Sequence, residues 1–189
     1  MTYLQELQQE LFYLIAPSGF AGKYYHFYEA HSEVQRESGL AFDFDHQWIV
    51  PPERLADMLE ETLLASGLDF KFSGAGDFFE SLEKFEGLEI GLKVALHNSK
   101  IEFMLVLKTT DRRIEWPFWG LAAEIELLRD ADFEYFPRNP KLPVSSPETL
   151  AEAVNFGVTL YNQVKGLILS HHQGWTLAVS QSFWNQAAA

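Results

Sequence analysis

The sequence predicts an α+β fold: a single domain over residues 1–189, with an antiparallel sheet of about four or five strands from two hairpins, helices on one face and a long C-terminal helix. Three observations predict it. Residues 88–107 alternate apolar and polar side chains around a short polar turn, which is typical of a hairpin with one buried face. Both ends of the chain repeat apolar residues every three or four positions, as amphipathic helices do. Strand and helix patterns do not alternate, so a parallel sheet is not expected.

The N-terminal segment is predicted to be a helix. Thr2 is a suitable N-cap, and the apolar residues over 3–15 follow helical spacing. Pro17, Gly19 and Gly22 are expected to end this helix.

A hairpin and a second helix are predicted to follow. The aromatic-rich segment 23–34 favours a strand, and residues 40–44 alternate as a half-buried strand does. Residues 36–39 have the composition of a turn, so the two strands are expected to pair. Pro51 and Pro52 are expected to open a helix with its apolar stripe between residues 55 and 63.

The middle of the chain contains the clearest strand pattern. Residues 67–76 are interpreted as a loop with a short strand near 70–72, and Asp77 as the cap of a brief helix over 78–85. Residues 88–96 and 101–107 then form the second hairpin around the turn 97–100.

The last part of the chain is predicted to be mainly helical. Residues 115–119 form a loop or the start of a helix over 121–129, residues 133–136 a short edge strand, and residues 138–147 an extended connection. A long helix then begins at Ser146 or Pro147 and ends at about Leu169. The tail from about residue 173 contains Trp175, Phe183 and Trp184, and we expect it to fold back, to be mobile or to dock on a second copy.

The charge of the chain is strongly negative and uneven. The net charge is -13, and residues 29–89 contain fifteen acids and four bases, a net charge of -11. Residues 90–146 contain eight of each and are neutral. Nucleic acids and anionic membranes need a basic footprint, so neither is an expected partner. Two explanations stay open: acids that solvate outer faces, or an acidic surface that attracts a basic protein.

The remaining composition narrows the compartment and the chemistry. There is no cysteine, so disulfides and thiolate sites are excluded. The first ten residues have two glutamates and no Lys or Arg, and no apolar run reaches the ~18 residues of a membrane span. We therefore expect a cytoplasmic protein. No cofactor is predicted, because residues 74–76 lack the spacing of a phosphate-binding loop and no Gly-x-Ser-x-Gly occurs.

The histidines give no metal motif. No two of the six have His-Glu-x-x-His spacing. Asp43 and Asp45 share a strand face in the predicted hairpin and are suited to a hard cation, but solvated strand acids explain them more simply. No metal is predicted.

A non-enzymatic acidic protein that binds a basic partner protein is the predicted function. In size, charge and a hairpin-then-helix opening over about residues 24–66, the chain resembles bacterial immunity proteins, which neutralise basic nuclease toxins. That resemblance implies an immunity or antitoxin role. The three aromatic rings around Pro117, those of Trp116, Phe118 and Trp119, are either an anchor for a partner or a plug at the end of the sheet. The candidate partner-binding residues are Glu29, Glu33, Asp43, Asp45, Glu60, Glu61, Trp116 and Trp119.

Two alternative functions remain. The first is a small enzyme or small-molecule binder with an aromatic-lined pocket and a His/carboxylate acid–base pair, with His46 beside Asp45 and Trp48, or His97, as the histidine. The second is a homo-oligomeric adaptor that pairs through the edge of the second hairpin or through the last helix.

Overall fold

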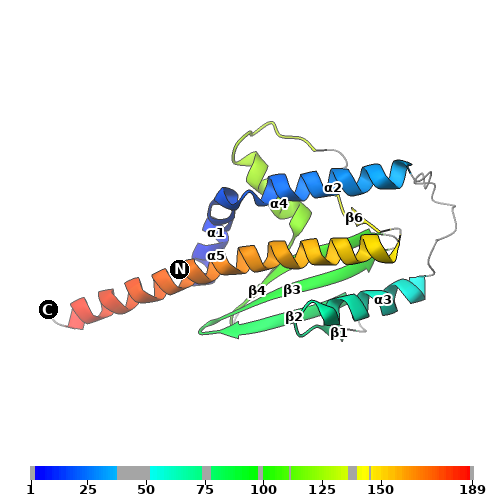
Figure 1. Cartoon of the computed structure of the whole chain (residues 1–189). Helices are drawn as coiled ribbons and strands as arrows, with labels where there is room; N and C mark the ends of the chain where they lie inside the picture. The colour runs from blue at the N-terminus through cyan, green and yellow to red at the C-terminus, as the bar shows by residue number, and fades with distance from the viewer. Residues whose placement is uncertain are drawn as a thin grey trace.

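The computed structural model describes residues 3–37, 52–73, 78–97, 100–110, 112–135, 140–144 and 146–187; for residues 34–37, 52–55 and 175–187 it describes the backbone alone. Within these segments the predicted α+β class is confirmed. An antiparallel sheet packs against helices, and the C-terminal helix is the longest element (Figure 1).

The N-terminal helix α1 (Tyr3–Ile15) forms as predicted. Leu4, Leu7 and Leu11 lie on its buried stripe. A short 3-10 turn η1 (Ala16–Ser18) follows, and Gly19 adopts the left-handed conformation with φ 72°, which a side chain would disfavour. The helical path therefore changes direction at Gly19, and a second helix begins at the next residue.

That second helix, α2 (Phe20–Glu37), replaces the strand predicted over residues 23–34, and the prediction is wrong. Its buried residues are Phe20, Ala21, Tyr24, Tyr25 and His31, a helical spacing that the β propensity of the aromatic residues outweighed in the sequence interpretation. The first hairpin therefore does not form, and its other predicted strand, residues 40–44, lies outside the described residues. Gly22, expected to end the first helix, lies inside α2. The resemblance to immunity proteins depended in part on this hairpin, and that part of it does not hold.

The sheet is built mainly from one continuous run of strands. They are β1 (Lys71–Ser73), β2 (Phe78–Phe85), β3 (Leu88–His97), β4 (Lys100–Lys108) and β5 (Arg113–Pro117), in that spatial order and all antiparallel. The predicted β3–β4 hairpin is confirmed, with Leu92 opposite Leu105 and His97 opposite Lys100. The short β6 (Leu142–Pro143) pairs with the start of β4.

Two further predictions, the helix over residues 78–85 and the strand over residues 133–136, are wrong. The brief helix expected after Asp77 is β2, in which Phe79 and Ser81 are buried and their neighbours are more exposed. Gly87, with φ 73°, makes the tight turn into β3. The segment 133–135 is not a strand. Residues 115–119, predicted as a loop or the start of a helix, are the end of β5 and the start of α4 (Phe118–Leu127).

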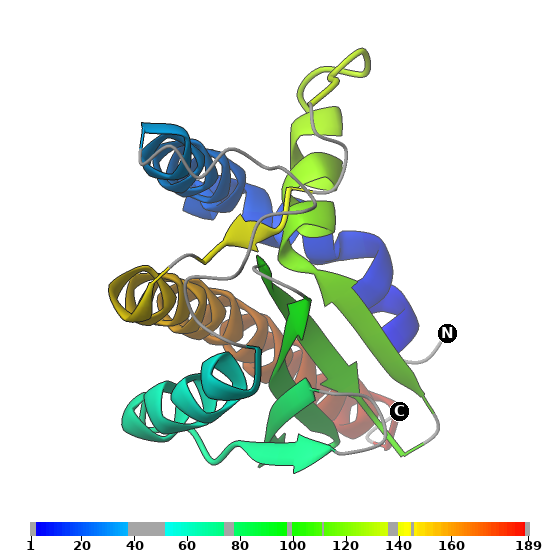
Figure 2. The same ribbon diagram turned by 90° about the vertical axis from the view of Figure 1, so that its right-hand side faces the viewer.

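Helices cover one face of the sheet. Helix α5 (Pro147–Ala187) crosses that face, with α2 along one side and α3 (Pro52–Ala65), which begins as the two prolines predict, along the other (Figures 1 and 2). Helix α1 lies near the β5 edge and packs against α4 and α5. The end predicted for the last helix, about Leu169, is wrong: α5 continues to Ala187 and extends beyond the sheet (Figure 1). The tail with Trp175 is this continuation.

Apolar side chains from the sheet and from all five α-helices meet in a shared core. The inward residues of β3 and β4, such as Ile90, Leu92 and Leu105, are fully buried against α5 residues that include Val154 and Tyr161. None of the described helices is both long enough and apolar enough to cross a membrane.

Candidate functional site

The four predicted acidic residues that the structure describes lie on two separate helices. Glu29 and Glu33 are exposed on α2, whereas Glu60 and Glu61 are exposed on α3, on the other side of α5. The Tyr135 hydroxyl donates a hydrogen bond to Glu29 at 3.1 Å. Asp43 and Asp45 lie outside the described residues, as do His46 and Trp48.

Several acids of the segment 29–89 are neutralised by bases from later in the chain. The pairs are Glu80 with Arg113, Glu83 with Lys165 at 2.7 Å, and Glu89 with Lys108 at 3.1 Å. The net charge of -11 counted along the sequence therefore overstates the charge that is unpaired in space.

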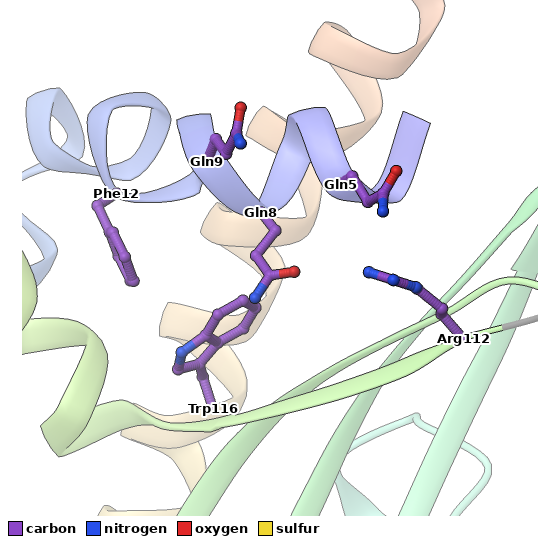
Figure 3. A pocket seen from close by; sticks show the side chains of 6 residues that line it. All are labelled: Gln5, Gln8, Gln9, Phe12, Arg112 and Trp116. Atoms are coloured by element: carbon purple, nitrogen blue, oxygen red, sulfur yellow. The ribbon is translucent and has the colours of Figure 1, made fainter. Parts of the chain in front are cut away.

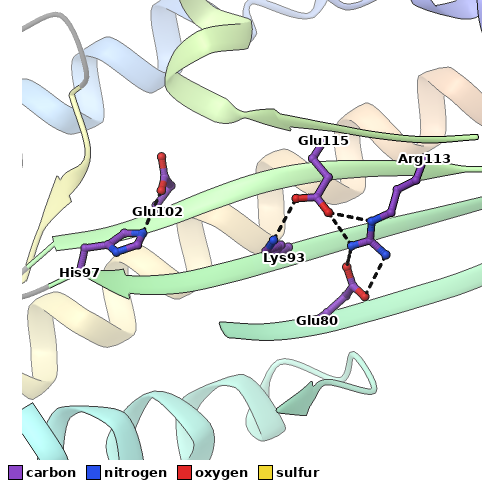
Figure 4. A network of polar contacts seen from close by, with 6 residues as sticks. All are labelled: Glu80, Lys93, His97, Glu102, Arg113 and Glu115. Carbon is purple, nitrogen blue, oxygen red and sulfur yellow. Dashed lines mark hydrogen bonds and ion pairs between the residues drawn. The ribbon is translucent and has the colours of Figure 1, made fainter. Parts of the chain in front are cut away.

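The outer face of the sheet carries a network of charges across its strands (Figure 4). Arg113 Nε donates to Glu115 at 2.7 Å and its terminal nitrogens donate to Glu80, while Lys93 Nζ lies 2.9 Å from Glu115. Burial raises the pKa of the Glu115 carboxyl, but the hydrogen bonds and charges of Lys93 and Arg113 outweigh it and the pKa falls below its usual value. Val106 of β4 is buried on this face. These charged side chains therefore pair with one another and link β2, β3 and β5 across the outer face of the sheet.

A second polar cluster surrounds Glu102 of β4. Trp119 Nε1 donates to its carboxylate at 2.8 Å, Lys141 Nζ lies 2.9 Å away and His97 Nε2 lies 3.1 Å away. Burial raises the pKa of Glu102, but these donors outweigh it and lower the pKa below its usual value. Trp119, predicted as a partner anchor, is half-buried here and its N–H is engaged within the chain. The histidine side chain is 52% exposed.

Helix α3 presents a run of exposed acids next to strand β1, on which Lys71 is also exposed. Asp57, Glu60 and Glu61 are exposed, and none of them forms an ion pair with a described residue. Leu64 of the same helix is 63% exposed, and Phe72 of β1 is 57% exposed. Both figures show α3 next to β1 at the edge of the sheet (Figures 1 and 2). We name this surface, comprising Asp57, Glu60, Glu61, Leu64, Asp69 and Phe72, the α3–β1 edge.

Trp116 lies at the opposite edge of the sheet. It is half-buried on β5 and meets the ring of Phe12 edge-on, with 5.9 Å between ring centroids. Together with side chains of α1 it lines an open groove (Figure 3). The two tryptophans of the predicted pair therefore face different surroundings.

Comparison with protein families, characterised proteins and solved structures gives no match. The function must therefore be argued from the surfaces themselves. Within the described segments, no three His, Asp or Glu side chains converge as a metal site requires.

The sequence interpretation missed the apolar residues of the α3–β1 edge. The predicted inner stripe ends at residue 63 and gives Leu64 no role, although the buried Leu59 and Leu63 place the next position outside. Phe72 was assigned to a short strand, but only the strand order shows that β1 is at the edge. The outward position of Leu64 could have been predicted from the helical spacing of α3. The edge position of Phe72 could not, because it depends on the order of the strands.

Proposed function

We propose that this chain is a non-enzymatic protein-binding protein that engages a basic partner protein through the α3–β1 edge. The observation that carries the proposal is the coincidence of carboxylates that form no ion pair with a described residue and two exposed large apolar side chains on that edge. An immunity or antitoxin role, in which the basic partner is a toxin, is one form of this function.

The carboxylates supply attraction and orientation. Asp57, Glu60 and Glu61 follow one another on the solvent side of one rigid helix, so their negative potentials add. Such a potential steers an oppositely charged partner and raises the rate of encounter. Because the screening length is about 8 Å at physiological ionic strength, the attraction should weaken as salt rises.

The exposed apolar side chains supply the area that a partner can bury. Large exposed hydrophobic residues are few among the described residues: Tyr13, Leu64, Phe72, Leu127 and Leu128. Two of these five, Leu64 and Phe72, lie on the edge that also carries the acids of α3. Apolar contacts at the centre of an interface with charges at its rim are the usual arrangement of protein-binding surfaces. The partner segment should therefore carry both basic and apolar side chains.

A short peptide of alternating lysine and leucine is the probe for this proposal. Nuclear magnetic resonance titration of the full chain should give shifts confined to α3 and β1, and affinity should fall with added salt. The variant Asp57→Asn/Glu60→Gln/Glu61→Gln should weaken binding about tenfold or more. Shifts that map to other elements would refute this site.

The matched control removes the same charge from another exposed surface. Asp130, Asp132 and Glu134 are exposed in the segment after α4, and Asp130→Asn/Asp132→Asn/Glu134→Gln changes the net charge equally. This variant should bind the peptide as the unmodified chain does. Equal weakening by the two triple variants would show general charge attraction instead of a docking surface.

Acid–base chemistry at His97 is a second candidate function, favoured by one observation. Its Nε2 lies 3.1 Å from the carboxylate of Glu102, the arrangement in which a carboxylate orients a catalytic imidazole. If it operates, the chain should hydrolyse p-nitrophenyl acetate faster than either His97→Gln or Glu102→Gln. Equal rates in all three proteins would remove this candidate.

A further inference from the structure

A groove between helix α1 and strand β5 has the features of a peptide-binding site (Figure 3). Its volume is about 740 Å³, and its walls are Gln5, Gln8, Gln9 and Phe12 from α1 with Arg112 and Trp116 from the strand side. Ligand-binding clefts are commonly of this size. It lies at the opposite edge of the sheet from the α3–β1 edge.

We propose that this groove binds an extended peptide segment carrying a carboxylate, which adds as a strand to the free edge of β5. Strand β5 pairs with β4 along one side only, and none of the described residues pairs with its other side. The backbone N–H and C=O groups on that side are a template for strand addition. Pro117 has no N–H, so the usable edge is residues 113–116.

The side chains of α1 complement a peptide backbone. Gln5 and Gln8 line the groove on its α1 side and Gln8 points toward Trp116, whereas Gln9 points away from the strand (Figure 3). Each primary amide has donors and an acceptor, which match the acceptor and donor of a peptide group. A strand laid beside β5 would therefore meet the sheet edge on one side and amides on the other.

The apolar part of the groove fits one side chain of such a strand. Phe12 and Trp116 pack edge-on at 5.9 Å between centroids, and both are half-buried. Side chains of an extended peptide alternate in direction, so every second residue can point toward this pair. A residue with an apolar side chain is preferred at that position.

The charge of the groove selects the ligand. Arg112 is the one ionic side chain in its lining, its side chain is exposed, and the described residues supply it with no ion pair. A guanidinium binds a carboxylate through two parallel hydrogen bonds. In a chain with a net charge of -13, a lining with a cation and no carboxylate favours an anionic end group or an acidic side chain.

The test uses the full chain and three pools of random short peptides. One pool has a free C-terminal carboxylate and no acidic residue, the second is amidated with one Asp or Glu, and the third is amidated and neutral. The two acidic pools distinguish the two sources of the carboxylate. We expect binding from at least one of them, little from the neutral pool, and slowed hydrogen exchange at β5 amides. No binding from either acidic pool at millimolar concentration, or protection at β1 instead of β5, would overturn the proposal.

Two variants make the carboxylate contact falsifiable. Arg112→Gln removes an exposed cation, so folding should be kept, and affinity for the acidic pool should fall about tenfold. Lys84→Gln removes an equally exposed cation from β2 and should leave the affinity unchanged. Equal affinities in Arg112→Gln and the unmodified chain would contradict the assignment of the ligand class. The triple variant of the α3–β1 edge should keep this binding, so failure of one proposal is distinguishable from failure of the other.

Discussion

Gly157 of α5 lies against the ring of Phe103 of β4, and a methyl group at Gly157 would lie 2.5 Å from Phe103 Cε1. The contact is possible because glycine has no side chain, and it sets how closely the long helix approaches the centre of the sheet. Phe103 also packs against Phe118 at 5.9 Å between ring centroids, so the ring has little space to retreat.

We therefore expect Gly157→Ala to destabilise the fold. Alanine favours a helix over glycine by about 1 kcal/mol, but overpacking a core commonly costs about 1–3 kcal/mol. The net loss in the free energy of unfolding should be up to about 2 kcal/mol, measured by chemical denaturation.

Gly166→Ala is the matched control on the same helix. Nothing lies within 4 Å of the position a Cβ would occupy at Gly166, which is exposed. Helix propensity should then act alone and stabilise the chain by up to about 1 kcal/mol. Similar effects from the two alanine variants would contradict the close packing of Gly157 on Phe103.

Tyr161→Phe tests a polar contact in the core. The Tyr161 hydroxyl oxygen lies 2.8 Å from Glu83 Oε1 and 3.2 Å from the carbonyl oxygen of Ile90, and the side chain is fully buried. Removing the hydroxyl should cost about 1–2 kcal/mol in the free energy of unfolding, because a hydrogen bond to a charged group is lost. Tyr13→Phe, at a position 67% exposed, should change the free energy little. An equally small change at Tyr161 would argue against this bond.

Arg113→Met tests the charge network on the outer sheet face. Glu80 and Glu115 would lose their shared cation, leaving Lys93 as the partner of Glu115. The expected loss is about 1–2 kcal/mol at low salt, and it should shrink as salt screens the remaining carboxylates. Arg129→Met, which removes an exposed partner of Glu126 in α4, should cost less than about 0.5 kcal/mol. A loss at Arg113 no larger than at Arg129 would mean that the network adds no stability.

The pattern of the β3–β4 hairpin was predictable because one of its faces is buried and the other is exposed, so apolar and polar residues alternate strictly. Helix α2 was not predicted because Tyr24, Tyr25, Phe27 and Tyr28 favour a strand by propensity. Their helical spacing is visible only when Phe20 and Ala21 are included. The central position of the hairpin was also not predictable. It gives both hairpin strands neighbours, so the open edges belong to β1 and β5, and the hairpin-edge interface considered from the sequence is not available.

Charge counting by segment had a related weakness. Glu80, Glu83 and Glu89 belong to the acidic segment, but their cations come from β4, β5 and α5. Pairing across a sheet depends on register, which a local count does not contain. Glu60 and Glu61 of α3 could be predicted from the sequence, because the apolar stripe of a helix defines which of its positions face solvent; Asp57 was not among the predicted residues.

Acid unfolding should depend on Glu102. Its pKa is lowered in the folded chain, despite the opposing effect of burial, by hydrogen bonds from Trp119 and Lys141 and by the charges of Lys141 and His97. The folded state therefore binds the proton more weakly than the unfolded state does. The stabilisation is fully present above the ordinary carboxyl pKa of about 4.3 and is lost as pH falls through the lower folded-state pKa.

Glu102→Gln should consequently lower the free energy of unfolding at neutral pH by about 1–3 kcal/mol, since the charged acceptor is removed. The gap between the two proteins should narrow below about pH 4.3, where the unmodified chain begins to lose the same interaction. Denaturation midpoints measured between neutral and acidic pH give the comparison, with Glu124→Gln on the exposed side of α4 as the control for general loss of charge. Curves for Glu102→Gln and the unmodified chain that stay parallel down to the acid limit would show that the carboxylate of Glu102 is not held ionised by its neighbours.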